Sequence, residues 1–105
     1  MAALDLESPP MTLTPPQPTL DFYRREGCPP CDEARLSLQQ VLEDRVRRGD
    51  RIPRVRYRNV EDSPELESAF GARVPVIAIG SDELSLTVSE RSIATFLDRV
   101  LGRAA

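Results

Sequence analysis

The sequence predicts one α/β domain in which strands and helices follow the order βαβαββα, with a central four-stranded mixed sheet flanked by helices. The first observation is hydrophobic periodicity: short runs alternate apolar and polar residues, whereas longer runs place apolar residues three or four positions apart. The second is the length of the first strand–helix–strand unit, which suits parallel pairing through a right-handed crossover. The third is the chain length of 105 residues, which supplies one modest core.

The first two predicted elements are a strand and a long helix. Leu20, Phe22 and Tyr23 open the extended run, and a helix over residues 29–48 follows it. Proline is favoured in the first turn of a helix, where its missing N–H has no intrahelical partner, and Gly49 is a natural C-terminal stop. The apolar stripe of this helix comprises Cys31, Ala34, Leu38, Val41 and Leu42.

The remaining elements are shorter. In chain order we expect a strand at 54–59, a helix at 64–70 capped by Ser63, a strand at 74–79, a turn at 80–82, a strand at 84–88 and a helix that Ser89 caps and that runs to Leu101. Because only a short turn separates the third and fourth strands, they must pair antiparallel. The first and last helices each have one apolar face, so we expect both to cover the sheet.

The two ends of the chain are predicted to lie outside the domain. Five of the ten prolines fall within residues 1–18, and proline removes backbone donors and biases its neighbours toward extended conformations. We therefore predict a flexible tail without chemistry over residues 1–18, a folded domain over 19–101 and a short C-terminal tail over 102–105.

The composition excludes several functions. The chain has no His, which excludes Ser-His-Asp and Cys-His catalysis and His-ligated metal sites, and its 14 basic residues are all Arg, which excludes catalytic lysines. A net charge of −3 and the lack of Trp argue against a nucleic-acid partner. No run approaches the ~20 apolar residues of a membrane span. No export signal is evident either, so we expect a cytoplasmic protein that does not bind membranes.

The motif that carries the chemistry is Gly27-Cys28-Pro29-Pro30-Cys31. It follows a strand and opens a helix, whose N-terminus stabilises a thiolate. Cys28 precedes a proline, so its backbone is pushed toward an extended conformation just outside the helix and its side chain is exposed. Cys31 falls in the first turn, on the buried stripe. We therefore predict that Cys28 is the nucleophile that forms a mixed disulfide, and that Cys31 is the resolving thiol.

Over residues 19–101 the chain resembles the thioredoxin superfamily, and in particular its small glutaredoxin-like proteins. The resemblance is carried by the Cys-Pro-Pro-Cys motif, by Arg73-Val74-Pro75 at the head of the third strand, and by the element order. It implies a thioredoxin fold and thiol–disulfide exchange. It also implies that Pro75 is cis beside the active-site disulfide and that Val74 offers backbone groups to a substrate peptide or glutathione.

Two further residues match the glutaredoxin pattern around the first cysteine. Dithiol glutaredoxins have Cys-Pro-Tyr-Cys with a basic residue three positions earlier, and here Pro29 and Arg25 occupy those places, while Pro30 replaces the tyrosine. The resemblance therefore implies substrate-binding roles for Arg25 and Pro29 together with Val74 and Pro75.

We expect no permanently bound cofactor. After the fourth strand, Val88-Ser89-Glu90-Arg91 stands where the family has a Gly-Gly-x-Asp glutathione loop, which leaves glutathione as a candidate co-substrate. The expected partners are a disulfide-containing protein or glutathione and a reductase, with the chain itself a monomer. Thioredoxins carry a buried Asp in the first strand. Phe22 stands at the nearest position here, so we expect no acid at that position to accept the proton of Cys31.

Other interpretations of the cysteines and arginines stay open. The two thiolates could form half of a zinc or iron–sulfur site shared between two chains, since four-coordinate zinc needs two more ligands. They could also be inert thiols in a domain that only docks a partner protein. Seven arginines lie from Arg45 to Arg58, where we expect a solvated helix end and strand edge rather than a patch for an acidic partner.

Overall fold

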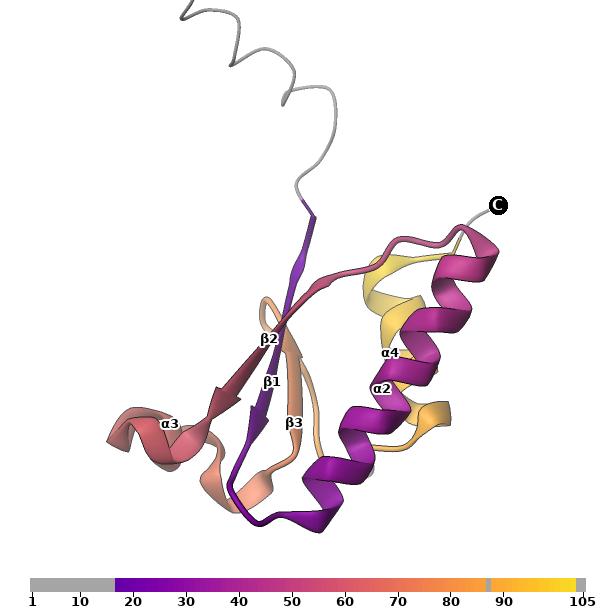
Figure 1. Ribbon diagram of the computed structural model, residues 1–105. Coiled ribbons are helices and arrows are strands. Elements are labelled where there is room, and N and C mark those ends of the chain that lie inside the picture. Colours follow the sequence, from indigo (N-terminus) through magenta and orange to yellow (C-terminus); the bar gives the residue numbers. More distant parts are fainter. Residues whose placement is uncertain (1–16, 87, 104–105) are drawn as a thin grey trace, which may run out of the picture.

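The computed structural model describes residues 17–86 and 88–103, and within them four strands form one mixed sheet in the order β2-β1-β3-β4 (Figure 1). The strands are β1 (Thr19–Arg24), β2 (Arg54–Asn59), β3 (Val76–Ile79) and β4 (Asp82–Leu84). β1 pairs in parallel with β2 and antiparallel with β3, which pairs antiparallel with β4. The predicted α/β class, the element order and the antiparallel pairing of the last two strands are confirmed.

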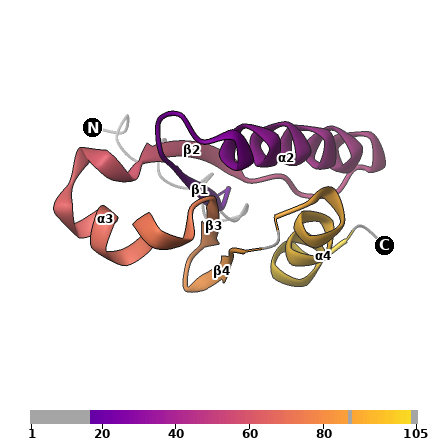
Figure 2. The same ribbon diagram turned by 90° about the horizontal axis from the view of Figure 1, so that it is seen from below.

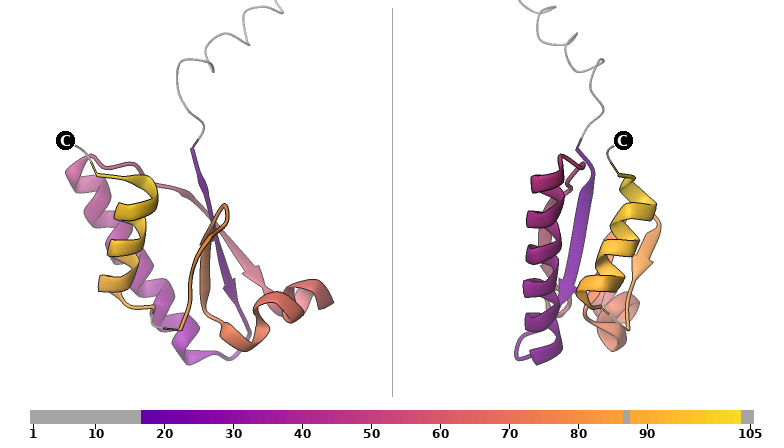
Figure 3. Two further views of the ribbon diagram at one scale, coloured as in Figure 1. Left: turned by 180° about the vertical axis from the view of Figure 1, so that it is seen from behind. Right: turned by 90° about the vertical axis from the view of Figure 1, so that its right-hand side faces the viewer.

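Two helices cover one face of the sheet and lie side by side (Figure 3). They are α2 (Pro29–Arg48) and α4 (Glu90–Leu101). α2 ends at Gly49, whose left-handed backbone (φ 80°) lets its N–H reach the carbonyls of Arg45 and Val46. The main core lies between these helices and the sheet, and includes Leu20, Phe22, Leu38, Ile77, Ile93 and Leu97.

A short helix, α3 (Pro64–Phe70), lies on the opposite side of the sheet (Figure 2). It is preceded by the 3-10 turn η2 (Val60–Asp62) and followed by η3 (Gly71–Arg73), two turns that the sequence pattern does not predict. Ser63 caps α3 as expected, because its hydroxyl accepts the Leu66 N–H at 3.0 Å.

The core on the α3 side is small. Its buried residues are Tyr23, Val60, Val76 and Ala78. Tyr23 stacks on Phe70 with ring centroids 3.9 Å apart. Burial, followed by the neighbouring charge of Asp21, raises the pKa of the Tyr23 phenol. The two sides of the sheet are thus packed very unequally.

The prediction for the fourth strand is wrong in position. β4 occupies residues 82–84 instead of 84–88, because a two-residue turn at Gly80 and Ser81 places Ile79 opposite Asp82. Leu86 then adopts a positive φ of 72° and is 84% exposed, which is incompatible with a continuing strand. The third strand likewise begins at residue 76, after the predicted start at 74.

The predicted N-terminal tail falls mostly outside the described residues, as do residues 104 and 105 of the predicted C-terminal tail. The last two residues of the predicted N-terminal tail lie beside the start of β2. The Pro18 carbonyl accepts the Arg54 N–H at 2.7 Å, and the Gln17 side-chain amide donates to the Ile52 carbonyl at 3.2 Å. The boundary at residue 19 stays a prediction. Among the described helices, none combines the length and apolarity that crossing a bilayer requires.

One arginine of the Arg-rich interval is buried, contrary to the expected solvated surface. Arg45 is 0% exposed and joins the C-terminal ends of α2 and α4. Its guanidinium donates to the Arg51 carbonyl at 2.7 Å, to the Asp98 carboxylate at 3.0 Å and to the Gly102 carbonyl at 2.7 Å. Each nitrogen of the buried Arg45 guanidinium therefore has an acceptor, as a buried charge requires.

We expect Arg45→Met to lower the free energy of unfolding by roughly 2–4 kcal/mol, because the apolar stem is kept while the three acceptors lose their donor. Urea denaturation of purified protein measures this value. Arg47→Met is the matched control, since Arg47 lies on the same helix, is mostly exposed and pairs with Asp44 one turn away. Equal stability of the two variants would contradict the role assigned to Arg45.

Candidate active site

Cys28 occupies the N-cap of α2. Its backbone is extended (φ −120°, ψ 94°), as expected before a proline. Pro29 and Pro30 fill the first two helical positions and have no N–H. The Cys31 N–H is therefore the first that the helix can offer, and it donates to the Cys28 Sγ at 3.2 Å. This hydrogen bond and the positive end of the helix both favour negative charge on Cys28.

The two cysteines form a disulfide, with their Cα atoms 5.2 Å apart. This separation lies within the usual range for disulfides and follows from placing one residue at the N-cap and the other in the first turn. Cys31 is 1% exposed, whereas Cys28 is only partly buried. Cys28 is therefore more accessible than Cys31, as expected from the sequence, and the roles of the two residues stay predictions.

Val74 and Pro75 lie at the same end of the sheet as the cysteines. β1 and β3 are antiparallel neighbours with Tyr23 opposite Val76, so β1 ends where β3 begins (Figure 1). The Val74–Pro75 peptide bond is cis, as the resemblance implied. Pro75 is buried and Val74 is half-buried with an extended backbone (φ −59°, ψ 144°).

Arg25 reaches from the loop after β1 toward α3. Its Nη2 donates to the Glu67 carboxylate at 2.6 Å and to the Gly71 carbonyl at 3.0 Å. Its Nη1 lies 3.6 Å from the carboxylate of Glu61, which also accepts the Glu26 N–H at 3.4 Å. The hydrogen bond with Glu67 is the main reason that the pKa of Arg25 is raised. No contact between Arg25 and a cysteine is seen among the described residues.

A side chain at Gly71 would displace its neighbours. A Cβ at this position would overlap the carboxylate of Glu67 and would lie 2.9 Å from the Arg25 Nη2, so the end of the Glu67 side chain would have to shift. The backbone of Gly71 is ordinary right-handed helical (φ −54°), which other residues also adopt.

The acid of β1 does not serve the cysteines. Asp21 alternates with Phe22 along the strand, and Phe22 faces the core beneath α2. The Asp21 carboxylate is bound by Arg56 at 2.8 Å and lies 3.7 Å from Arg58, both on β2. Asp21 is therefore not placed to accept a proton from Cys31.

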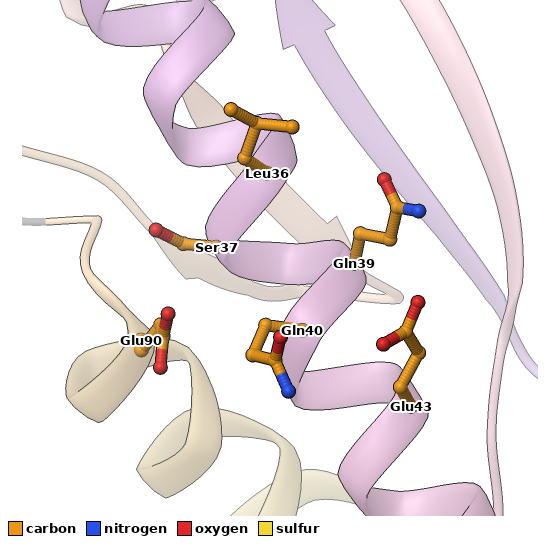
Figure 4. Close-up of a pocket in the computed structure, with 6 residues that line it drawn as sticks. All are labelled: Leu36, Ser37, Gln39, Gln40, Glu43 and Glu90. Carbon is orange, nitrogen blue, oxygen red and sulfur yellow. The ribbon is translucent and has the colours of Figure 1, made fainter.

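Two features other than the cysteine pair bear on where a functional site can lie. Within residues 17–86 and 88–103, no three Cys, Asp or Glu side chains gather as ligands for a metal ion. An open hollow of about 360 Å³ between α2 and α4 contains neither cysteine (Figure 4). It is lined by Leu36, Ser37, Gln39, Gln40, Glu43 and Glu90.

The predicted site residues thus divide into two groups. Cys28, Cys31 and the exposed Pro29 form one continuous segment, and Val74 with Pro75 directly precedes β3 at the same end of the sheet. Arg25 comes from the adjoining loop but is held by α3. The residues that hold it, Glu61, Glu67 and Gly71, were not predicted as part of the site.

Comparison with known proteins agrees with this geometry. Residues 19–98 match the model of the glutaredoxin-like domain family (DUF836). An X-ray structure of target protein XcR50 from X. campestris superimposes with a TM-score of 0.63 at 29% sequence identity, covering 77% of this chain and 97% of that one. No curated protein sequence matches significantly. The fold is thioredoxin-like, with a disulfide-capable Cys-x-x-Cys pair.

We expect Pro30→Ala to raise the reduction potential of the cysteine pair by roughly 10–30 mV. The new N–H at the second helical position would donate to the Cys28 thiolate, and one such bond is typically about 0.5–1.5 kcal/mol, with about 30 mV per 1.4 kcal/mol. Equilibration with glutathione redox buffers, followed by thiol trapping, measures the potential.

Pro29→Ala is the positional control, because an N-cap side chain accepts from the second or third helical N–H and not from the first. The missing donor also predicts a wild-type potential more negative than that of a Cys-Pro-Tyr-Cys site. A wild-type value above about −200 mV, the upper end of the glutaredoxin range, would contradict this account.

Proposed function

The chain belongs to the glutaredoxin-like domain family, and from its dithiol site we propose that it is a thiol–disulfide oxidoreductase. The observation that carries the proposal is the asymmetry of the cysteine pair. Cys28 caps α2 and is accessible, while its disulfide partner Cys31 is buried in the first turn. One sulfur can therefore meet a substrate while the other waits within bonding distance.

In the reducing direction the reaction begins with the Cys28 thiolate. It attacks one sulfur of a substrate disulfide, and the other substrate sulfur leaves as a thiolate. The product is a mixed disulfide between Cys28 and substrate. The Cys31 N–H and the N-terminus of α2 stabilise the attacking thiolate before the new bond forms.

Cys31 completes the exchange. Its thiol loses a proton to solvent or to the departing substrate thiolate, since the acid of β1 faces the other side of the sheet. The Cys31 thiolate then attacks the Cys28 Sγ and releases the second substrate thiolate. The substrate has gained two electrons and the protein holds the Cys28–Cys31 disulfide, which is the oxidised state of this structure.

We assign substrate docking to the surface beside Cys28. Val74 and Pro75 directly precede β3 at this end of the sheet, and Pro29 is exposed next to the nucleophile. An extended substrate segment that aligns with the Val74 backbone would bring its disulfide to Cys28. A direct role for Arg25 in substrate binding stays a prediction.

The proposal includes recycling of the disulfide by an external donor. Glutathione or a thioredoxin-type reductase would return the pair to the dithiol, so no resident cofactor is required. The proposed location is the cytoplasm, a reducing compartment in which paired cysteines are more often catalytic than structural. The proposed partners are a disulfide-containing protein and the reductase, with the chain acting as a monomer.

We expect Cys28→Ser to abolish reduction of insulin or hydroxyethyl disulfide. Cys31→Ser should retain attack but accumulate the mixed disulfide, because the resolving sulfur is missing. Turnover assays measure the activity, and intact-protein mass spectrometry detects the trapped substrate on Cys28.

Metal analysis of protein prepared in metal-free buffer provides the opposing test. Stoichiometric zinc or iron bound through both cysteines, together with no disulfide reduction by the dithiol form, would replace the proposal with a metal-binding module. A fully active Cys28→Ser variant would reject Cys28 as the nucleophile.

A further inference from the structure

We propose that Arg25 is a positioning residue that ties the loop carrying Cys28 to the segment leading into Pro75. Glu67 and Gly71 are the groups that hold it. This inference rests on the proposed function, because it concerns how the two halves of the same site are kept in register.

The contacts of Arg25 join these two segments directly. Arg25 lies three residues before Cys28, in the loop between β1 and α2. The Gly71 carbonyl, which accepts from the Arg25 Nη2 at 3.0 Å, lies at the start of η3, four residues before Pro75. One guanidinium therefore spans the gap between the nucleophile loop and the docking segment.

The charge around Arg25 favours positioning over capture of a substrate carboxylate. Glu67 accepts from the same Nη2 at 2.6 Å, and Glu61 lies 3.6 Å from the Nη1. Two carboxylates thus face one guanidinium, and its charge is already matched within the protein. The Arg25 side chain is only 32% exposed, so the ion pair is partly shielded from solvent.

The space at Gly71 provides a way to perturb this contact without changing Arg25 or Glu67. A Cβ there would overlap the Glu67 carboxylate, with the Cδ of that carboxylate 2.6 Å away. Alanine fits the right-handed helical backbone of this position without strain. Gly71→Ala therefore acts by displacing the carboxylate of Glu67 from Arg25 and from the carbonyl that Arg25 contacts.

Glu67→Gln separates the two roles by the sign of its effect. If Arg25 bound an anionic substrate, removing the Glu67 charge would free the guanidinium and lower the KM of an anionic disulfide peptide. If Arg25 positions the two segments, the same change loosens them and raises the KM. A purely structural role would lower stability without splitting KM from kcat.

The experiment compares the full-length wild type with Glu67→Gln and Gly71→Ala. We measure kcat and KM for an acidic disulfide-bonded peptide, the pKa of the Cys28 thiol by thiolate absorbance, and urea unfolding. We expect the peptide KM to rise roughly threefold to tenfold in both variants, as for one weakened charge-assisted contact, with the Cys28 pKa unchanged. Arg25→Lys should raise the KM as Arg25→Gln does, because one ammonium cannot reproduce the planar guanidinium fork.

Glu65→Gln is the matched control, since it removes an exposed carboxylate from the same helix. Its KM should equal that of wild type. An unchanged or lowered peptide KM in Glu67→Gln would overturn the inference. So would a raised Cys28 pKa in Arg25→Gln that Arg25→Lys reverses. If the wild type reduces no disulfide at all, the proposed function itself fails, an outcome distinct from either.

Discussion

The site depends on the hydrogen bond between the Cys31 N–H and the Cys28 Sγ. Two prolines leave the first turn of α2 without earlier donors, so this N–H and the helix end are what the backbone offers to a negative sulfur. The same bond places the second sulfur beneath the first. The start of α2 therefore accounts both for the donor that meets the Cys28 sulfur and for the closeness of the two sulfurs.

The sheet supplies that support because β1 is central. β1 contacts β2 on one side and β3 on the other, and it runs directly into the cysteine loop. Its antiparallel pairing with β3 brings the cis Val74–Pro75 bond to the same end. Two segments more than forty residues apart thus share a site, because they join to adjacent strands of opposite direction.

Most of the fold and the centre of the site could be predicted from local patterns. The stripe of α2 and the Cys-Pro-Pro-Cys motif are contained in short stretches of chain, and their physical meaning depends on neighbours a few residues away. The prediction of the fourth strand was wrong in position because the alternation of Leu84, Leu86 and Val88 is compatible with a strand and with an irregular segment. Only the positive φ of Leu86 distinguishes the two.

Contacts between distant segments had no signal in a single sequence. The hydrogen bonds of Arg25 with Glu67 and Gly71 join residues that are 42 and 46 positions apart in the sequence. A glycine whose missing Cβ leaves room for a neighbouring side chain looks the same in a sequence as a glycine that a turn requires. Arg45 shows the same limit, since an arginine within an Arg-rich run carries no mark of being buried at a junction of two helices.

The unequal layers of the sheet have a consequence for partial unfolding. The layer beneath α2 and α4 holds most of the core, whereas the α3 layer rests on four buried residues and one aromatic stack. Cooperative units with few apolar contacts open at the lowest free energy. Amide hydrogens of α3 should therefore exchange before those of α2. The open form would keep the cysteine pair bonded but would no longer support the segment before β3, where substrate docking is proposed.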